Sequence, residues 1–531
     1  MKILLLGGTG VFGSRLARLL VRDMLTVTIA GRNVVNAQAL ADELNCSALR
    51  MDRSGDLSEL NGFDVVIDAA GPYHAYGEDP YRLVRAAIQS GVHYLDLCDN
   101  AAFCSGIQGL DAEAKAAGVC AISGMSSVPA LSSAVVRALA QDDVPISIDT
   151  AILPGNRSPR GLSVMASILS QVGRPMKVFR AGRWIDATGW SAPRRYTLPE
   201  GLSRQGWLIE VPDVALFPKH FGAQTVVFRA GLELGAMRYG LWFFALLRRW
   251  LPIPINGPVL RIFKLAADLL APYGSDRGGM SVDIYVGQER RWWRLLVDEG
   301  DGPYIPTIAI RALLRRTSLP LGAEPALETI TLTEAEAAMS DLKVRSERGT
   351  EVVQTIFQDV LGAEFEKLPE TIRATHMTKV ISRWRGKASV RRGQSTWSKL
   401  LGWGFGFPAS VDDIQVEVIK TVTRSGETWE RRFGERRFKS YLAPNARGMT
   451  ERFGPFTFRL GLKVVEGCLY YPVISGRISL LPLPRWLLPT SDAREYEKNG
   501  RFHFDVQLSA PFTNKLLVHY QGELSAAVPE F

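Results

Sequence analysis

The stretch "LLLGGTGVFGSRLARLL" (Leu4–Leu20) decides the fold of the first part of the chain. A short apolar run ends at Leu6, glycines follow at positions 7, 8, 10 and 13, and an amphipathic segment begins at Ser14. This order predicts a strand, a tight turn and a helix. Glycines spaced as G-x-G-x-x-G let backbone N–H groups approach a pyrophosphate at a helix N-terminus. A secretion signal is disfavoured, because four apolar residues behind one lysine are too few for its apolar region.

The segments that follow alternate between apolar strands and helices. Strands are expected at residues 3–6, 26–30, 64–69, 93–97 and 119–122. Buried-type strands separated by helices are typical of a parallel, doubly wound sheet. Residues 1–140 are therefore expected to form an α/β Rossmann domain that binds a dinucleotide.

The end of the second expected strand indicates which dinucleotide binds. NAD sites usually carry Asp or Glu there, to accept a hydrogen bond from the ribose 2′-OH. This chain has "IAGRN", with Arg32 and Asn33 and no acid. A guanidinium can pair with a 2′-phosphate, so NADP (NADPH) is favoured over NAD. The alternative is that Arg32 is a solvated residue at the start of a helix.

Further site residues follow from the carboxyl ends of the expected strands, where ligands bind in such sheets. The expected cofactor-binding residues are Gly7, Gly8, Thr9, Gly10, Val11, Phe12, Gly13, Arg32, Asn33, Asp52, Ala70, Gly71 and Pro72. The expected cleft residues are Tyr73, His74, Asp96 and Ser127. No catalytic acid or base is assigned among them, and no metal site is expected.

Residues 141–347 mix strand and helix patterns and are expected to form an α+β domain for substrate binding or dimerisation. Its most apolar part spans residues 231–270. Within it, "YGLWFFALLRRWLPIPI" (Tyr239–Ile255) is too short to span a bilayer. Either it is a buried helix, or it lies at a membrane interface with Arg248 and Arg249 at the headgroups. The polar stretch Arg345–Glu351 is the expected linker to the next domain.

Period-two patterns dominate residues 352–525 and predict a curved antiparallel sheet. In "RFHFDV", His503 and Asp505 share one face, so Phe502 and Phe504 are expected to face the core. The other polar or aromatic groups noted in this domain are His376, Trp429, Arg431, Glu451 and Glu495. Arg431 with Glu451 or Glu495 either lines a pocket or forms a rim salt bridge.

Composition limits the class of protein. The chain has 531 residues, too many for one hydrophobic core, and its five cysteines form no CxxC pair, which argues against disulfides and a zinc site. The net charge of +9 lies mostly beyond residue 352, where 26 Lys and Arg stand against 18 Asp and Glu. That excess either attracts an anionic partner or is a solvated surface. Nucleic acid is not the expected partner.

These motifs carry a resemblance. In order and spacing, "GGTGVFG", "IAGRN", "DAAGPY", "GVHYLDLCDN" and "SGMSSVP" resemble the NADP-binding domain of saccharopine dehydrogenase-like oxidoreductases. "GDGPYIPTIAIRALL" (Gly300–Leu314) and "GAEPALETITLTE" (Gly322–Glu334) are similar to segments that close that family's second domain. The resemblance implies a Rossmann domain with an inserted α+β domain, and hydride transfer at a nicotinamide. One departure is Ser126–Ser127, where the family often has Asp-Ser.

The C-terminal part resembles a bacterial domain of unknown function, DUF4166. The stretches that carry this resemblance are "VLGAEFEKLPETIRATH", "TWERRFGERRFKS", "ERFGPFTFRL", "LPLPRWLLPTSDAREYE" and "GRFHFDVQLSAP". It implies no chemistry.

Two other enzyme classes are disfavoured. Short-chain dehydrogenases need Tyr-x-x-x-Lys, and no tyrosine in residues 1–345 has a lysine four positions later. Hydrolases with a G-x-S-x-G elbow are disfavoured too, because the motif is missing.

We expect a cytoplasmic NADP-dependent oxidoreductase that reduces a C=O, C=N or C=C bond of a small, lipid-like molecule. The alternative is a non-catalytic NADP-binding sensor or a membrane-associated scaffold, peripheral at the inner face of the membrane. A homodimer is left open.

Overall fold

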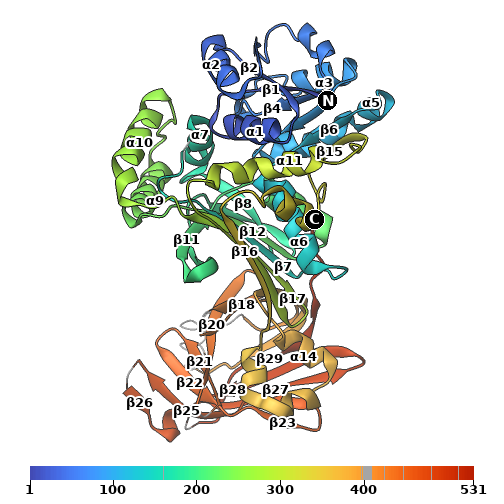
Figure 1. The fold of residues 1–531 in the computed structure, drawn as a ribbon. Coiled ribbons are helices and arrows are strands. Elements are labelled where there is room, and N and C mark those ends of the chain that lie inside the picture. The colour runs from blue at the N-terminus through green and yellow to red at the C-terminus, as the bar shows by residue number, and fades with distance from the viewer. Residues whose placement is uncertain are drawn as a thin grey trace. The chain divides into compact units, whose positions relative to one another are not determined.

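The computed structural model describes residues 1–159, 161–395, 398, 409–423, 425–446, 448–479, 481–511 and 513–531. They divide into two compact units. Unit 1 consists of Met1–Arg180 and Trp184–Glu351, and unit 2 consists of Ala181–Arg183 and Val352–Phe531 (Figure 1).

A parallel sheet forms the N-terminal half of unit 1, with strands in the order β15-β6-β5-β4-β1-β2-β3. The strands are β1 (Lys2–Leu6), β2 (Thr26–Gly31), β3 (Ser47–Arg50), β4 (Val65–Asp68), β5 (His93–Asp96), β6 (Cys120–Ser123) and β15 (Gly322–Pro325). Every described pair in this sheet is parallel. The expected doubly wound Rossmann fold is confirmed.

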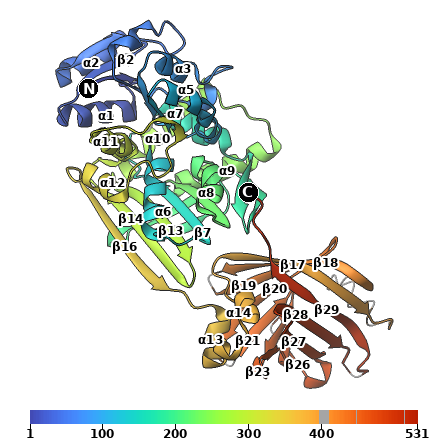
Figure 2. The same cartoon turned by 90° about the vertical axis from the view of Figure 1, so that its right-hand side faces the viewer.

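Alternate residues of β1 enter two separate cores. Ile3 and Leu5 pack into the core on one face of the sheet, and Leu4 and Leu6 pack into the core on the other. Both faces are covered by helices, which explains why this strand is apolar without alternation (Figure 2). The helices are α1 (Val11–Arg22), α2 (Val34–Leu44), α3 (Arg82–Gln89), α4 (Ala101–Gly106), α5 (Asp111–Ala116), α6 (Ser132–Ala140), α11 (Ile308–Leu314) and α12 (Leu332–Ala338).

Strand β15 shows that the second domain is inserted into the first. The chain leaves the parallel sheet after β6, builds the second domain, and returns to pair Gly322–Pro325 with Cys120–Ser123. One continuous core joins both parts, because Leu5 of β1 belongs to the same cluster of buried side chains as Met280 and Trp293 of the inserted domain. The inserted α+β architecture is thereby confirmed.

The inserted domain is built on a mixed sheet in the order β10-β11-β12-β7-β13-β14-β16, with β8 and β9 attached through β12. Its strands are β7 (Ser147–Leu153), β8 (Pro175–Arg180), β9 (Arg183–Thr188), β10 (Arg194–Thr197), β11 (Ser203–Leu208), β12 (Thr225–Gly231), β13 (Gly278–Val286), β14 (Glu289–Val297) and β16 (Val344–Val352). Its helices are α7 (Leu162–Gln171), α8 (Pro212–Phe221), α9 (Gly235–Trp250) and α10 (Gly257–Leu270).

The expected linker at Arg345–Glu351 is wrong in its secondary structure. These residues belong to β16, which pairs with β14 at the end of the mixed sheet. Most of the strand is exposed. An edge strand with charged side chains avoids pairing with other chains, and this is why its sequence looks like a polar connection.

Unit 2 consists mainly of one antiparallel sheet, in the order β23-β24-β27-β28-β29-β17-β18-β19-β20-β21-β22-β25-β26. The strands are β17 (Ile381–Arg392), β18 (Val411–Thr423), β19 (Gly426–Phe433), β20 (Arg436–Asn445), β21 (Gly448–Phe453), β22 (Phe456–Leu460), β23 (Lys463–Val465), β24 (Cys468–Tyr470), β25 (Val473–Ile478), β26 (Leu481–Leu483), β27 (Thr490–Lys498), β28 (Arg501–Ser509) and β29 (Leu516–Ala526). The sheet is strongly curved, and α13 (Ile356–Leu361) and α14 (Glu370–His376) pack against it (Figure 1). The expected antiparallel C-terminal fold is confirmed.

Within the described residues, none of the helices has the length and apolar character needed to cross a membrane.

Candidate functional site

The turn between β1 and α1 brings backbone segments into close contact. Gly7 has φ +76°, and a Cβ on it would lie 2.7 Å from backbone atoms of Ala70. A Cβ on Gly13 would lie 2.3 Å from the carbonyl oxygen of Gly7. A larger residue at either position would force the backbone apart. The glycine spacing in the sequence therefore has a direct steric cause.

Helix α1 begins directly after this turn, with Gly10 as its N-cap residue. The amides of Val11, Phe12 and Gly13 belong to the first turn, where N–H groups have no intrahelical acceptor. No acidic residue occupies this turn, and Thr9 and Gly10 are exposed. A helix end with free amides and a positive dipole suits phosphate groups. The loop fits the pyrophosphate of a dinucleotide.

Two cations, Arg32 and Arg50, lie at the carboxyl ends of β2 and β3. Arg50 ends β3, and its register partner is Gly31, which immediately precedes Arg32. Both guanidinium groups are exposed, and within the described chain neither forms an ion pair. The sequence did not point to Arg50, because only the pairing of β3 with β2 brings it to the strand end that Arg32 follows.

Asn33 and Asp52 lie at the same sheet edge, and their side chains take part in local turns. The Oδ1 atom of Asn33 accepts hydrogen bonds from the amides of Val35 and Asn36, at 3.1 and 3.2 Å, and so caps α2. The Oδ1 atom of Asp52 accepts one from the amide of Ser54 at 3.0 Å. Both side chains shape the loops around the cofactor region.

Asp96 holds together the loops that follow β5 and β6. Its Oδ1 atom accepts hydrogen bonds from the amides of Cys98 and Gly124, at 2.9 and 2.7 Å, and from the Ser123 hydroxyl at 3.1 Å. Burial raises the pKa of Asp96 to about 7, although these bonds stabilise its ionised form. The carboxylate is fully buried beneath the loops. It therefore positions the cleft and does not line it.

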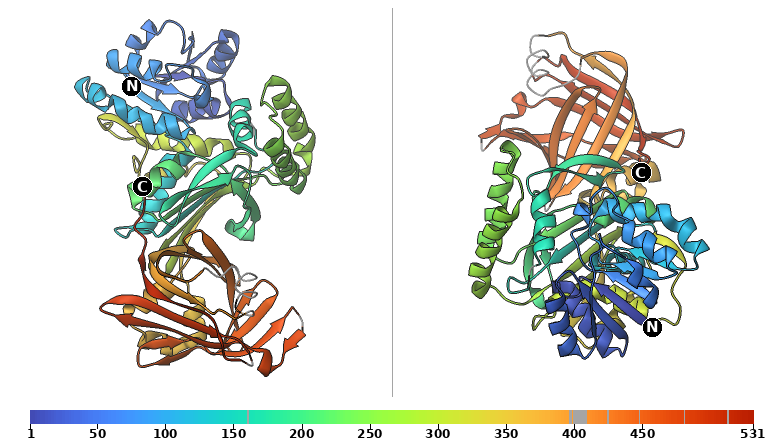
Figure 3. Two further views of the ribbon diagram at one scale, coloured as in Figure 1. Left: turned by 180° about the vertical axis from the view of Figure 1, so that it is seen from behind. Right: turned by 90° about the horizontal axis from the view of Figure 1, so that it is seen from above.

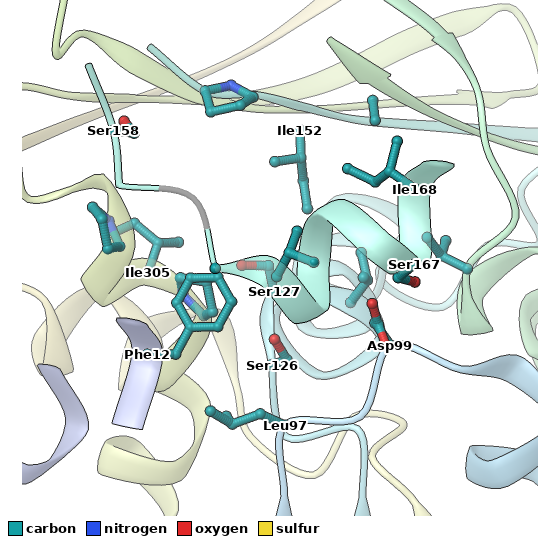
Figure 4. Close-up of a pocket in the computed structure, with 18 of the residues that line it drawn as sticks. Phe12, Leu97, Asp99, Ser126, Ser127, Ile152, Ser158, Ser167, Ile168 and Ile305 are labelled. Carbon is teal, nitrogen blue, oxygen red and sulfur yellow. The ribbon is translucent and has the colours of Figure 1, made fainter. Parts of the chain in front are cut away.

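Phe12 of α1 and the loops after β4, β5 and β6 form one wall of a cavity of about 330 Å³. The opposite walls come from α7, from β13 and β14, and from the segments around residues 209–211 and 302–306. Most lining groups are apolar, as Figure 4 shows for Phe12, Leu97, Ile152, Ile168 and Ile305. A volume of this size is within the range of small-molecule sites.

The expected residues divide into those that line this cavity and those that do not. Among them, Phe12, Ala70, Gly71, Pro72, Tyr73 and Ser127 line it. The Tyr73 hydroxyl donates to the backbone oxygen of Asp68 at 2.6 Å, so this side chain is held in place from behind. His74 is exposed and is not part of the lining.

Asp99 is an ionisable residue of the cavity wall that the sequence analysis missed. It lies in the loop after β5, three positions beyond Asp96, and is half-buried. Its carboxyl group is hydrogen-bonded to Ser167 of α7, and the two side chains lie close together in Figure 4. Burial raises the pKa of Asp99, and the bond from Ser167 opposes this shift. The signal in the sequence that could have identified Asp99 is an acidic residue shortly after the end of a strand.

Helices α9 and α10 lie side by side (Figures 1 and 3). These helices and the residues directly after them carry an exposed apolar surface. The exposed apolar side chains are Tyr239, Trp242, Phe243, Leu246, Leu247, Trp250, Leu251, Ile262, Leu265, Leu269 and Tyr273. The fully buried alternative for this segment is therefore wrong. Its inner face does pack, because Leu241 and Ala245 join a core cluster with Leu169 of α7.

The two arginines near the end of α9 have different environments. Arg248 is buried, and its Nη1 atom donates to the backbone oxygens of Leu169 and Val172, at 2.5 and 2.7 Å. It therefore anchors α9 to the end of α7, and the expectation that it contacts headgroups is wrong. Arg249 is exposed.

In unit 2, the alternation in β28 is as expected, since Phe502 and Phe504 are buried. His503 and Asp505 lie on the opposite face, where Asp505 contacts His519 at 2.7 Å and Arg494 at 3.1 Å. On the buried face, Arg431 and Glu495 line a second cavity. Arg431 also donates to Glu451 at 3.2 Å.

Two family models match the chain. Residues 3–122 match the saccharopine dehydrogenase NADP binding domain, and residues 368–524 match the domain of unknown function DUF4166. Both resemblances drawn from the motifs are confirmed, and the first domain is of an NADP-binding type.

The solved structures to which the chain is similar are distant in sequence. Apo histidine-tagged saccharopine dehydrogenase (L-Glu forming) from Saccharomyces cerevisiae is 13% identical, with 66% of this chain and 99% of that chain covered and a TM-score of 0.45. A short-chain dehydrogenase from Sphingobium yanoikuyae in complex with NADPH is 19% identical, with 23% and 70% covered and a TM-score of 0.19. No curated protein matches the chain.

Proposed function

We propose that unit 1 is an NADP-dependent oxidoreductase acting on a small, lipid-like molecule with a C=O, C=N or C=C bond. One observation carries this proposal: an apolar cavity of about 330 Å³ adjoins the glycine-rich loop at the carboxyl ends of β1, β4, β5 and β6. In doubly wound sheets this edge binds dinucleotide and substrate together.

The residues that would hold the dinucleotide follow from the geometry. The amides of the first turn of α1 would bind the pyrophosphate, and Arg32 with Arg50 would bind the 2′-phosphate. The backbone of Ala70–Pro72 supports the loop through its contact with Gly7. When bound, NADPH supplies a hydride. The residues of the chain bind the cofactor and supply the proton.

Asp99 is suited to supply the proton. It is on the cavity wall, its pKa is raised by burial, and Ser167 orients its carboxyl group. A protonated Asp99 would donate to the substrate heteroatom, or carbon, that becomes more basic during reduction. Tyr73 and Ser127 would border the same space, with the Tyr73 hydroxyl already committed to Asp68.

The exposed surface on α9 and α10 supports access of the substrate from a membrane. Arg249 and Arg261 are exposed beside the apolar side chains, and within the described residues neither forms an ion pair. Aromatic residues together with cations are typical of helices that lie in the interface of an anionic bilayer. Helix α10 packs on α7, and α7 lines the cavity. This arrangement favours peripheral docking at a membrane that supplies an apolar substrate.

The decisive test uses the full chain. NADPH binding is measured by fluorescence, and NADPH oxidation is then followed with aldehydes, ketones, imines and enoyl compounds bearing apolar chains. Binding with turnover that improves with chain length is the expected result. Absence of NADPH binding would remove the proposal, and binding without turnover on any compound would favour the non-catalytic sensor.

A further inference from the structure

Unit 2 contains a cavity of about 70 Å³ on the buried face of its sheet. Strands β17, β18, β19, β27, β28 and β29 contribute to it, together with α14. Aromatic and aliphatic side chains form most of the wall: Trp384, Val416, Val418, Trp429, Phe433, Phe502, Phe504, Val506, Tyr520 and Leu524. The polar side chains at the wall include Lys420, Arg431 and Glu495.

Lys420 is only 3% exposed, and within the described residues its amine has no carboxylate within 4 Å. The Nζ atom donates to the backbone oxygen of Thr375 at 2.5 Å and lies 3.9 Å from the centre of the Trp429 ring. It is 3.5 Å from Nδ1 of His376. These contacts hold the amine at the wall of the cavity, and none of them is with a carboxylate.

His376 is fully buried and connects Lys420 to Glu495. Its Nε2 atom is 2.5 Å from Oε2 of Glu495, and the Tyr471 hydroxyl donates to the same oxygen at 2.8 Å. Because the carboxylate accepts the Nε2 proton, the neutral ring presents a lone pair on Nδ1 toward Lys420. Burial and the neighbouring Lys420 lower the pKa of His376 to about 4, which keeps this ring neutral.

The surroundings of Lys420 favour the neutral amine. Burial lowers the pKa of Lys420 to about 8, while Glu495 and Glu427 oppose the shift and Arg431 adds to it. Burying such charged groups is costly, and a hydrophobic core of the same shape would avoid that cost. A desolvated lysine beside a hydrogen-bond acceptor is an arrangement used for nucleophilic amines.

We propose that the Lys420 amine is a nucleophile that forms an imine with a small aldehyde entering the cavity of unit 2. The Nζ lone pair adds to the carbonyl carbon, and an N–H proton transfers to the carbonyl oxygen, giving a carbinolamine. The C–O bond then breaks, the remaining N–H proton passes to the departing oxygen, which leaves as water, and a C=N bond forms. One amine and one aldehyde thus yield one imine and one water, without oxidation or reduction. The Nδ1 atom of His376 orients the attacking amine by accepting its other N–H.

The cavity sets the size of the aldehyde. Its volume is roughly half that of a cavity of about 150 Å³ that holds benzene. Propanal is therefore a suitable probe, and a bulky aromatic aldehyde is too large. This inference does not depend on the oxidoreductase activity of unit 1.

The test traps the imine in the full-length protein with propanal and cyanoborohydride, and peptide mass spectrometry locates the label. Lys387 is the internal control, because it is exposed and its ion pair with Asp413 raises its pKa. At pH 8 we expect label on the Lys420 peptide at least about tenfold faster than on the Lys387 peptide, since far more of the Lys420 amine is neutral. The rate at Lys420 should rise through about pH 8 and then level off.

Two variants sharpen the result. In His376→Gln, labelling of Lys420 should slow while that of Lys387 is unchanged. In Lys420→Arg, the fast labelling of the peptide that contains position 420 should disappear, and labelling of Lys387 should remain. Thermal melting of each variant confirms that it is folded. Labelling of wild-type Lys420 no faster than Lys387 would overturn the proposal, and so would equally fast labelling by a bulky aromatic aldehyde. The wild-type comparison requires no variant to fold.

Discussion

A Cβ on Gly13 would lie 2.3 Å from the carbonyl oxygen of Gly7, inside the turn that joins β1 to α1. Even alanine at position 13 must therefore push the helix away from the loop. We expect Gly13→Ala to weaken NADPH binding at least about tenfold, because the first-turn amides are displaced from the pyrophosphate. Fluorescence titration measures the change. Gly109→Ala is the control, since an added Cβ there meets nothing within 4 Å, and equal affinities for the two variants would contradict the steric argument.

The pairing of Gly31 with Arg50 predicts a shared site for the 2′-phosphate. Arg32→Ser and Arg50→Ser should each raise the Kd for NADPH roughly tenfold or more, which corresponds to the loss of one charge-assisted contact of about 1.5–3 kcal/mol. The Kd for NADH should stay unchanged, because NADH lacks that phosphate. Parallel titrations with both nucleotides measure these Kd values. Equal increases in Kd for NADPH and NADH would show that the arginines do not bind the 2′-phosphate.

The Asp99–Ser167 contact predicts a pH profile. Asp99→Asn should lower kcat by roughly 10²–10⁴ without changing the Kd for NADPH, as expected for loss of a general acid. The wild-type rate should be highest below the raised pKa of Asp99 and should fall as the pH rises through it.

Ser167→Ala tests the assignment further. Ser167 stabilises the ionised carboxylate, so its loss should move the alkaline limb to higher pH. Glu78→Gln removes an exposed acid of the same domain and serves as the control. If the alkaline side of the pH–rate profile does not move in Ser167→Ala, Asp99 is not the titrating group.

The apolar surface of α9 predicts membrane binding. Phe243→Glu and Trp250→Glu should reduce flotation with vesicles that contain phosphatidylserine, since these side chains are 58% and 81% exposed. Leu321→Glu changes an equally exposed apolar residue outside these helices, and it should float like the wild type. Wild-type flotation should also weaken with added salt. If all three variants float alike, the surface has another partner.

Arg311 predicts an acid-sensitive contribution to stability. It is 1% exposed and binds both Asp23 and Asp341. Arg311→Ala should lower the free energy of unfolding by about 1.5–3 kcal/mol, because the buried guanidinium's hydrogen bonds to two partly exposed carboxylates are lost. Arg316→Ala, which removes an exposed pair with Glu334, should cost at most about 1 kcal/mol.

The sign of the pH effect follows from Asp23. Burial raises the pKa of Asp23. The hydrogen bonds from Arg311 and Arg315 outweigh this effect and lower that pKa from 3.8 to about 2. This shift contributes about 2 kcal/mol above pH 3.8, and the contribution is lost as the pH falls through 2. Urea unfolding between pH 6 and pH 2 should therefore show the difference between wild type and Arg311→Ala narrowing with acid. A constant difference would contradict the assignment.

Local patterns made much of the fold predictable. The apolar run at Ile3–Leu6 followed by spaced glycines indicated β1, its turn and α1, because each depends on neighbours in the chain. Alternation in β28 predicted the inward Phe502 and Phe504 for the same reason. The expectation failed at Arg345–Glu351, where the position of β16 at a sheet edge made a strand look like a linker.

The site was less predictable than the fold. Gly7–Gly13 and Ala70–Pro72 could be named from motifs, but Asp99, Arg50 and Ser167 could not. Asp99 is oriented by its hydrogen bond to Ser167 of α7, more than sixty residues later in the chain. Arg248 similarly turns inward only because the end of α7 presents carbonyl oxygens to it.

The sequence by itself determined a dinucleotide-binding loop, its preference for NADP over NAD, and the succession of α/β, inserted and antiparallel parts. These rest on spacing, periodicity and side-chain type, which act over a few residues. The tertiary structure decided which groups lie together: Asp99 with Ser167 at the cavity of unit 1, and Lys420 with Glu495 at the cavity of unit 2, where His376 contacts both. Such groups meet only when segments distant in the chain pack together, and burial there changes their pKa values.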